Sequence, residues 1–217
     1  MKDVQEKIYC RVCDLGLVEY ERAHEEQKRL VDDVLADGPQ TILLCEHPPV
    51  ITLGRLSDKR HILFPQKYLQ ERGVPVHFVD RGGDVTLHAP GQLVVYPILR
   101  LSEQGKDLHA YMRGLEQVVI DLLAGFDIVA NRFPGRTGVW IGRQKIASIG
   151  IGVRKWVSYH GLAVNVNTEL GLFDLINPCG LDVSMTSVAR LKKEQIDMGQ
   201  VKQEIVGCFK KHFCFDV

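Results

Sequence analysis

Hydrophobic positions recur along this chain with two different periods. A period of about 3.6 residues, which is typical of a helix with one buried face, runs through residues 15–38, 106–126 and 198–213. The first of these helices is expected to end at Gly38, because glycine readily takes the left-handed conformation that often closes a helix. Leu17, Tyr20, His24, Leu30, Val31, Val34 and Leu35 share its buried face.

Apolar runs and a period of two residues predict strands in the rest of the chain. Residues 41–54 form two short apolar runs broken by two prolines, and 75–99 form three runs separated by Gly and Pro turns. Residues 137–167 alternate β-branched and aromatic residues with glycine turns. Long helices among hairpin-like strands favour an α+β fold with a mixed, mostly antiparallel sheet flanked by helices. We expect residues 1–217 to form one domain, because no repeat or long linker divides them.

Charge is balanced over the whole chain but uneven along it. The formal net charge is zero, so nothing draws the molecule as a whole to nucleic acid or membrane. Between positions 131 and 155, however, there are basic residues and no acidic ones, which would suit an acidic partner or simply be a set of solvated charges. The basic residues of this segment are Arg132, Arg136, Arg143, Lys145, Arg154 and Lys155.

The compartment is predicted from what the sequence lacks. The N-terminus has no secretory or transit pattern, and no run reaches the roughly 18 apolar residues of a membrane span. We therefore expect a cytoplasmic protein in which most of the six cysteines are reduced.

Five of the cysteines have ordinary structural interpretations. Cys10 and Cys13 form a single CxxC, but positions i and i+3 of a strand face opposite ways, and no second pair completes a zinc site. Cys45 lies in an apolar strand and is expected in the core. Cys208 and Cys214 are expected to pack on the last helix.

Cys179 is different, because it lies outside every periodic segment, between a proline and a glycine. It is either a small buried residue in a turn or a nucleophile. A nucleophilic thiolate needs a nearby base or cation to lower its pKa, and His88, His160 and Lys145 are the candidates. Lys145 begins an apolar, glycine-rich strand, where it is either partly buried with a depressed pKa or turned to solvent at a hairpin end.

The segment "DRGGDVTLHAPGQ" is the third region that could carry chemistry. Gly82 and Gly83 would allow the backbone to approach a ligand closely, and Arg81 and His88 bracket the turn. The spacing fits neither a dinucleotide fingerprint nor a Walker loop. Two tight turns would account for the glycines but would leave the charged and polar residues unexplained.

Three segments in this order resemble the lipoyl(octanoyl) transferases of lipoate biosynthesis, enzymes of the biotin/lipoyl protein ligase fold. They are "RGGDVTLHAPGQLVVYPI", "GVWIGRQKIASIGIGVRKWVSYHGLAVNVN" and "FDLINPCGLDVSMTS", and "LLCEHPPVITLGR" extends the likeness upstream. The chain departs from the family in "GLDVSMT", which is about one residue shorter than the usual stretch after the cysteine. It also has Leu87 where the family usually has Tyr, a change that would alter the acyl pocket.

The resemblance implies a role for each matching residue. Cys179 matches the cysteine that carries the acyl thioester, and Lys145 matches the lysine that lowers the pKa of that cysteine. The implied substrate-binding residues are Arg81, Gly82, Gly83, Asp84, Val85, Thr86, Leu87, His88, Ser148, Ile149, Gly150, His160, Gly161, Leu162 and Ala163.

The resemblance also implies a ping-pong acyl transfer without ATP, metal or other cofactor. Octanoyl-acyl carrier protein would be the donor, and lysines on the lipoyl domains of 2-oxoacid dehydrogenase E2 subunits and on the glycine cleavage H protein would be the acceptors. Either Lys145 or His160 would take the proton of the acceptor lysine. The basic segment would then dock the acidic carrier, and we expect a monomer that binds neither nucleic acid nor membrane.

Three other functions fit parts of the sequence. An ATP-dependent lipoate or biotin ligase would share the fold but would need a phosphate-binding segment that the sequence lacks. A catalytically inactive module would bind lipoyl domains without forming an acyl-enzyme. A hydrolytic cysteine enzyme would release free octanoate, although no Cys-His-Asn arrangement is evident.

Overall fold

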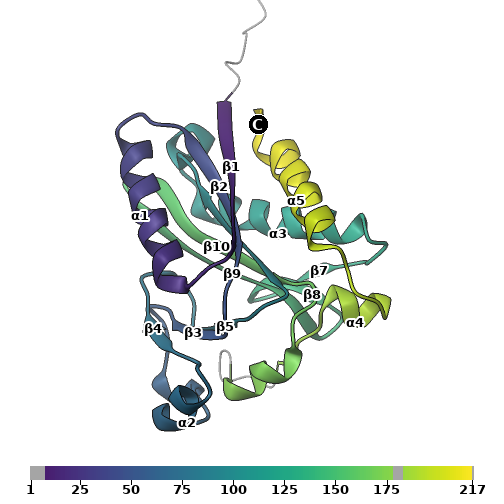
Figure 1. Ribbon diagram of the computed structural model, residues 1–217. Coiled ribbons are helices and arrows are strands. Elements are labelled where there is room, and N and C mark those ends of the chain that lie inside the picture. The colour runs from purple at the N-terminus through teal and green to yellow at the C-terminus, as the bar shows by residue number, and fades with distance from the viewer. Residues whose placement is uncertain (1–7, 178–182, 217) are drawn as a thin grey trace, which may run out of the picture.

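A computed structural model describes residues 8–177 and 183–216 of the chain (Figure 1). Its strands are β1 (Ile8–Leu17), β2 (Gln40–Glu46), β3 (Val50–Leu53), β4 (Val76–Phe78), β5 (Val85–His88), β6 (Gln92–Ile98), β7 (Asn131–Phe133), β8 (Arg136–Ile141), β9 (Gln144–Arg154), β10 (Val157–Asn165) and β11 (Phe215–Asp216). Its α-helices are α1 (Tyr20–Leu35), α2 (Gln66–Glu71), α3 (Leu108–Ala124), α4 (Val188–Lys192) and α5 (Met198–Phe213), and Lys59–His61, Leu101–Gln104 and Leu170–Leu175 form 3₁₀ turns.

The described strands form two sheets. The larger sheet has eight strands in the order β11-β1-β2-β6-β10-β9-β8-β7, and the smaller has three in the order β4-β3-β5. In the large sheet β1 runs parallel to β2 and β11, and the other neighbours are antiparallel. This arrangement confirms the predicted α+β fold with a mixed, mostly antiparallel sheet.

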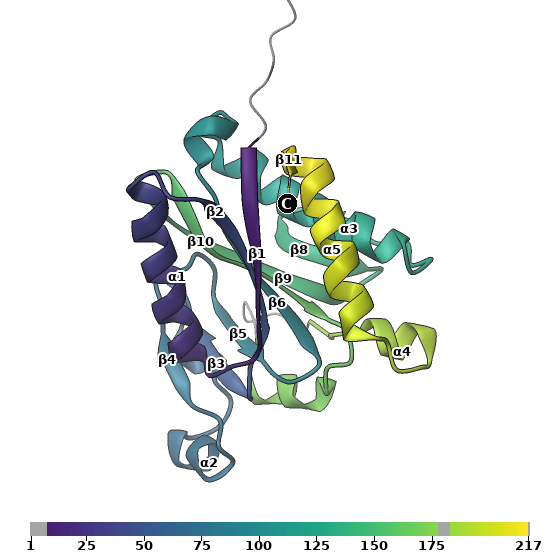
Figure 2. The ribbon, with the colours of Figure 1, turned by 45° about the horizontal axis from the view of Figure 1, so that its top comes forward.

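Helices cover both faces of the large sheet, with α1 on one face and α3 and α5 on the other (Figures 1 and 2). The apolar run in β2 explains this layering. Leu43 and Cys45 pack toward α1, whereas Ile42 and Leu44 pack toward α3 and α5. Burying an aliphatic side chain of this size contributes roughly 1.5–3 kcal/mol, so a strand that is apolar on both sides belongs in the middle layer. In the described part of the chain, no helix is both long and apolar enough to cross a bilayer.

The predicted boundaries of α1 are wrong at both ends. Leu15 to Leu17 belong to β1, and the helix starts only at Tyr20. At its C-terminus the left-handed residue is Asp37, with φ 64°, and the Gly38 N–H donates to the Asp33 oxygen at 2.8 Å. Gly38 is needed there for space, because a Cβ would lie 2.7 Å from that oxygen.

The cysteine predictions mostly agree with the structure. Cys10 packs in the core beneath α3 and α5, whereas Cys13 packs toward α1, so the CxxC residues face opposite sides of β1 as expected. Cys45 is buried and Cys208 contacts the core. The expectation for Cys214 is wrong, because it follows α5 in a left-handed conformation and is exposed.

Candidate functional site

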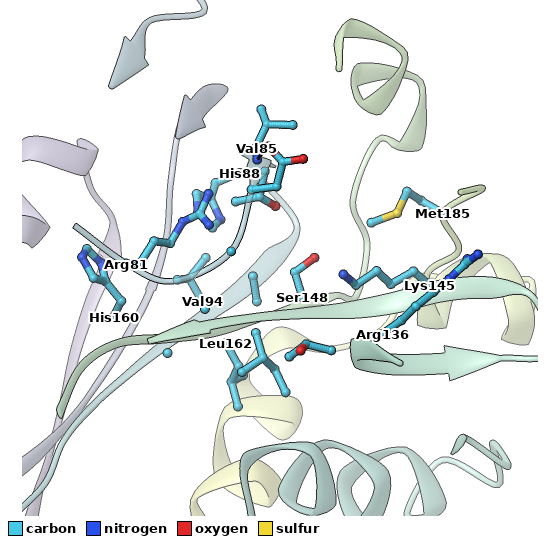
Figure 3. Close-up of a pocket in the computed structure, with 18 of the residues that line it drawn as sticks. Arg81, Val85, His88, Val94, Arg136, Lys145, Ser148, His160, Leu162 and Met185 are labelled. Atoms are coloured by element: carbon cyan, nitrogen blue, oxygen red, sulfur yellow. Dashed lines mark hydrogen bonds between the residues drawn. The ribbon is translucent and has the colours of Figure 1, made fainter. Parts of the chain in front are cut away.

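A pocket of about 290 Å³ lies where β9 and β10 of the large sheet meet the segment 81–88 that leads into and forms β5 (Figure 3). This volume is near the lower end of the range for small-molecule sites, so it suits a slender ligand. Its lining residues are Tyr20, Arg81, Gly83, Asp84, Val85, Thr86, His88, Val94, Tyr96, Gly135, Arg136, Thr137, Trp140, Lys145, Ser148, Ile149, Gly150, His160, Gly161, Leu162, Ala163, Phe173, Val183 and Met185.

Glycines in the sheet let the backbone of the 81–84 turn lie directly on β9. Gly150 and Gly161 face each other across the β9–β10 ladder. A Cβ at Gly150 would lie 2.9 Å from the Gly82 oxygen, closer than real Cβ atoms come. The Gly82 N–H also donates to the Ile151 oxygen at 2.8 Å. A side chain at position 150 would therefore push this turn off the pocket.

Lys145 lies at one end of the pocket, and its main chain is fixed on both sides. Its N–H donates to the Ser184 oxygen, and its carbonyl accepts from the Thr186 N–H, both at 2.9 Å. Its side chain passes over Gly138, where φ is +120° and a Cβ would lie 2.6 Å from Lys145 Cε. The ammonium is 5.5 Å from the centre of the Trp140 ring. Lys145 thus lines the pocket instead of pointing to solvent at a hairpin end.

The basic segment is only partly free to meet a partner. Arg132 pairs with the buried Glu116 carboxylate at 3.0 Å, and Arg154 pairs with Asp32. The Arg136 guanidinium lies 4.8 Å from the Phe133 ring centre and also borders the pocket. Arg143 is exposed in the β8–β9 turn. Four of the residues expected to form one surface therefore serve different purposes.

His88 lies at the opposite end of the pocket from Lys145 (Figure 3). Its Nδ1–H donates to Gln92 Oε1 at 2.7 Å, and Gln92 Nε2 donates to Asn165 Oδ1 at 2.9 Å. Burial lowers the pKa of His88 to about 3, so the ring is neutral at pH 7. This buried chain accounts for Gln92, which holds His88 in place.

Asp80 ties the glycine-rich turn to β10. Its carboxylate accepts from His160 Nε2 at 2.9 Å and from the Tyr159 hydroxyl at 2.6 Å. The hydrogen bond from His160 holds the pKa of Asp80 well below its usual range, so the carboxylate is ionised. Burial lowers the pKa of His160, and this outweighs the opposite influence of Asp80. A neutral imidazole therefore donates to a carboxylate here.

Arg81 follows Asp80 and is almost fully buried. Its guanidinium donates to the Thr52 carbonyl at 2.8 Å and to the Thr52 hydroxyl at 2.9 Å. Both partners belong to β3, so Arg81 joins the pocket wall to the small sheet.

The structure brings most of the sequence-predicted residues together in this pocket. Lys145 and all the predicted binding residues except Gly82 and Leu87 line it. Leu87 packs in the apolar cluster of the small sheet, with Ile51 and Leu69. Leu87 thus belongs to that cluster and does not line this pocket, and its effect on acyl binding stays a prediction.

Cys179 lies outside the described residues, as does the start of the segment that follows it. The rest of that segment is described, and Val183 and Met185 line the pocket. Lys145 also pairs its backbone with this segment, through Ser184 and Thr186.

Sequence reasoning did not place several lining residues in the pocket. These are Tyr20, Val94, Tyr96, Gly135, Arg136, Thr137, Trp140, Phe173, Val183 and Met185. Tyr20 fits the buried face of a helix as well as it fits a pocket, and no motif identifies it as a site residue. In the structure its buried hydroxyl has no hydrogen-bond partner among the described residues, and the same holds for Trp140 Nε1.

The two ends of the pocket differ in chemistry. Lys145 and Arg136 line one end, while the other is lined by neutral histidines, apolar side chains and the buried Arg81 guanidinium, which is bonded to Thr52 (Figure 3). Such a pocket can hold an apolar chain and present its reactive end to a cation. Among the described residues, His24, Asp80 and His160 bring metal-ligand atoms within 4.8 Å of one another.

Comparison with known proteins gives a consistent result. Residues 19–210 match the model of the lipoyl protein ligase A/B catalytic domain. The chain is 45% identical to an octanoyltransferase of Geobacter metallireducens over 198 residues, which is 90% of each chain. Among solved structures, a T. acidophilum protein with bound lipoic acid matches with a TM-score of 0.75 at 15% identity, covering 96% of this chain and 87% of that one. Lipoate-protein ligase A bound with ATP matches with a TM-score of 0.70 at 12% identity, covering 97% and 87%.

Proposed function

The chain belongs to the lipoyl protein ligase A/B catalytic domain family and is an acyltransferase, and we propose that it moves octanoyl groups from octanoyl-acyl carrier protein to lysines of lipoyl domains. In this proposal the acyl group passes through a thioester on Cys179. The observation that carries the proposal is that Lys145 and the segment following Cys179 border the same cavity.

In the first half-reaction, the Cys179 thiolate attacks the thioester carbonyl of the donor. The thiol of the carrier's prosthetic group leaves and takes up a proton, so one thioester replaces another and no ATP is consumed. The Lys145 ammonium favours the thiolate over the thiol, because an adjacent cation lowers a thiol pKa. The same ammonium is the proton donor to the leaving sulfur.

In the second half-reaction, the amine of the acceptor lysine attacks the acyl thioester, the Cys179 thiolate leaves, and the amine loses a proton. Lys145, neutral after the first half-reaction, is the proton acceptor in this proposal. Figure 3 shows His160 at the far end of the pocket from Lys145. His160 is also engaged with Asp80, which supports Lys145 over His160 as the base.

Backbone N–H groups are the proposed donors to the tetrahedral oxyanion. The Gly82 N–H already donates to Ile151, so it is not the donor. Gly83 and Gly150 line the pocket and stay candidates. Removing one such donor typically costs about 100- to 1,000-fold in rate.

The octanoyl tail occupies the cavity toward Val94, Leu162 and His88 in this proposal. Each buried CH₂ contributes about 0.8 kcal/mol, so the chain supplies several kcal/mol of binding. The low pKa of His88 supports this placement, because a neutral imidazole is a far better neighbour for an acyl chain than an imidazolium.

The proposed docking surface for the acidic carrier is smaller than the whole basic segment. Arg132 and Arg154 have acidic partners within the protein. Of the other basic residues, Lys155 is exposed in the β9–β10 turn, whereas Arg136 lines the pocket with Lys145 and Arg143 lies in the β8–β9 turn next to Lys145. The charges of Arg136 and Arg143 would steer an acidic protein toward the entrance.

A transfer assay without ATP tests the proposed function. Octanoyl-acyl carrier protein is mixed with an E2 lipoyl domain or with glycine cleavage H protein, and the acceptor mass is measured with and without the enzyme. We expect an octanoyl gain on the acceptor lysine without nucleotide. Transfer from free octanoate that requires ATP would identify a ligase instead, and release of free octanoate without acceptor would identify a hydrolase.

A further inference from the structure

We propose a binding site for a divalent transition-metal ion, of which Zn²⁺ is the representative, formed by His24, Asp80 and His160. These residues come from α1, from the turn after β4 and from β10, so the ion would join three separate segments. The proposal does not depend on acyl transfer.

The ligand atoms already converge on one point. His24 Nε2 lies 3.8 Å from Asp80 Oδ1, and His160 Nε2 lies 2.9 Å from the same oxygen. An ion held at about 2.0–2.2 Å by each of three tetrahedral ligands separates those ligands by roughly 3.3 Å. The three ligand atoms lie within 4.8 Å of one another, so the two imidazole rings would have to turn to bring their nitrogens to that separation.

His24 Nε2 is the observation that points to a ligand. This atom is buried and has no hydrogen-bond partner among the described residues, although it faces a carboxylate and another imidazole. Buried nitrogen atoms of this kind are rare in folded proteins and usually have a partner such as an ion or water. A metal ion would satisfy it.

The surroundings prepare the other two ligands for coordination. Asp80 Oδ2 accepts a hydrogen bond from the Tyr159 hydroxyl, so Oδ1 is the oxygen that faces the imidazoles. Hydrogen bonds of this kind commonly hold a metal-binding carboxylate in its orientation. Burial lowers the pKa of His24 to about 4 and lowers that of His160 as well, so both rings are neutral at pH 7, as metal ligands must be. The ion would take the place of the Nε2 proton that His160 donates to Asp80, and the neutral ring would then carry its proton on Nδ1.

Two features set the kind of ion and its affinity. Two imidazoles and one carboxylate favour Zn²⁺ or a similar ion over Mg²⁺ and Ca²⁺, which prefer all-oxygen ligands. The Asp80 side chain is half exposed, which leaves room for a water as fourth ligand. Arg55, Arg81 and Lys28 lie close enough to act on the histidines electrostatically, so they weaken the binding of any cation.

Binding of an ion would fix the position of the segments that border the pocket. His160 lines the pocket, and Asp80 precedes the turn that covers Gly150. An ion at this site would hold α1, the turn and β10 together and would raise the free energy of unfolding by mass action.

Titration of the full-length protein with Co²⁺, read by visible absorption, tests the site. An imidazole–carboxylate site gives the d–d bands of four-coordinate Co²⁺ without the near-ultraviolet charge-transfer band of a thiolate ligand, which excludes binding at the cysteines. We expect Zn²⁺ to displace Co²⁺ and Mg²⁺ to have no effect. We also expect Zn²⁺ to raise the Tm of the wild type.

Matched variants assign the ligands. His24→Gln removes one ligand and should weaken Co²⁺ binding by at least ~10-fold and abolish the Tm shift. Asp80→Asn removes a second ligand and should have the same effects. His77→Gln, which changes a neighbouring histidine paired with Glu21 at 3.6 Å, should bind like the wild type. The absence of Co²⁺ binding, a thiolate band, or equal binding by His24→Gln and wild type would overturn the proposal.

Discussion

The two ends of the pocket are lined by different kinds of basic residue. At one end, Lys145 lies near the start of β9, beside an exposed turn and close to Arg136 (Figure 3). At the other end, His88 and His160 are buried, and burial keeps both imidazoles neutral. The Lys145 end therefore suits thioester chemistry, whereas the other end combines neutral imidazoles and apolar side chains with one buried guanidinium, that of Arg81, whose donors are bonded to Thr52.

The two ends are also built from different parts of the chain. Short backbone contacts fix the Lys145 end, where the space over Gly138 decides what fits. Side-chain hydrogen bonds fix the histidine end, through Asp80 and Gln92. Substitutions at the first end should therefore change rates, whereas those at the second should change binding and stability.

Replacing Lys145 should have the largest effect. Lys145→Met removes the cation and the proton carrier, and we expect kcat/KM for transfer to fall by about 100- to 10,000-fold. Lys145→Arg keeps the charge but cannot act as a base, so it should acylate faster than Lys145→Met yet fail to transfer. Single-turnover assays of each half-reaction measure this, with Lys155→Met as the control. Near-normal turnover of Lys145→Arg would refute the base role.

Gly150→Ala should lower activity by roughly 100-fold, because displacements of about 1 Å near the chemistry can cost that much. The new Cβ would lie 2.9 Å from the Gly82 oxygen and 3.2 Å from Arg81 Cδ. Steady-state kinetics test this against Gly171→Ala, where no atom lies within 4 Å of the added Cβ. Equal activity of the two variants would show that the turn does not need to lie on β9.

Arg143→Glu should raise the KM for octanoyl-acyl carrier protein several-fold and make the rate less sensitive to salt. Arg143 is exposed and does not line the pocket, so kcat at saturating donor should change little. Arg154→Glu, whose partner Asp32 lies outside the pocket, serves as the control. Unchanged donor kinetics in Arg143→Glu would exclude the docking surface.

Asp80→Asn should raise the KM for donor by about 5-fold with a smaller change in kcat, because a half-exposed carboxylate contributes modestly. The amide can no longer accept the same bonds from both Tyr159 and His160, so the glycine-rich turn loosens. The assay is run with a chelator present, so that bound metal has no influence. A pure loss of kcat would instead place Asp80 among the reacting groups.

Acidification should destabilise the histidine end first. The pKa of His88 is about 3 in the folded protein and about 6.5 in the unfolded chain, so between these values the unfolded chain binds more protons. His88 therefore does not lower the free energy of unfolding above about pH 6.5. As the pH falls from there toward 3, the free energy of unfolding decreases by up to about 1.4 kcal/mol per pH unit. Urea unfolding from pH 7 to 4 measures the slope, which should be smaller in His88→Gln. An equal slope in the wild type and in His88→Gln would show that another group takes up the proton on unfolding.

Local patterns in the sequence predicted the elements well where packing reinforces them. The helix at 198–213 coincides with α5, and the strands interrupted by Pro48 and Pro49 coincide with β2 and β3. The start of α1 was missed because Leu15 and Leu17 fit a helix face as well as a strand, and pairing of β1 with β2 decides between them.

The candidate site was predictable only where a motif marks it. Residues of "RGGDVTLH" and "KIAS" were found from the resemblance, and most of them line the pocket. Tyr20, Trp140 and Phe173 come from distant parts of the chain and meet only through tertiary packing, so no spacing reveals them. The ligand set of His24, Asp80 and His160 has the same origin, because a helix, a turn and a strand supply one residue each.

Intact-mass measurement of the acyl-enzyme tests most directly whether the Lys145 end of the pocket carries the chemistry. The wild type is incubated with octanoyl-acyl carrier protein without acceptor or ATP, and peptide mapping locates any adduct. The account predicts a gain of one octanoyl group on Cys179, absent in Cys179→Ala and slowed in Lys145→Met. Efficient transfer to a lipoyl domain by Cys179→Ala, or a wild type that turns over without any adduct, would contradict it.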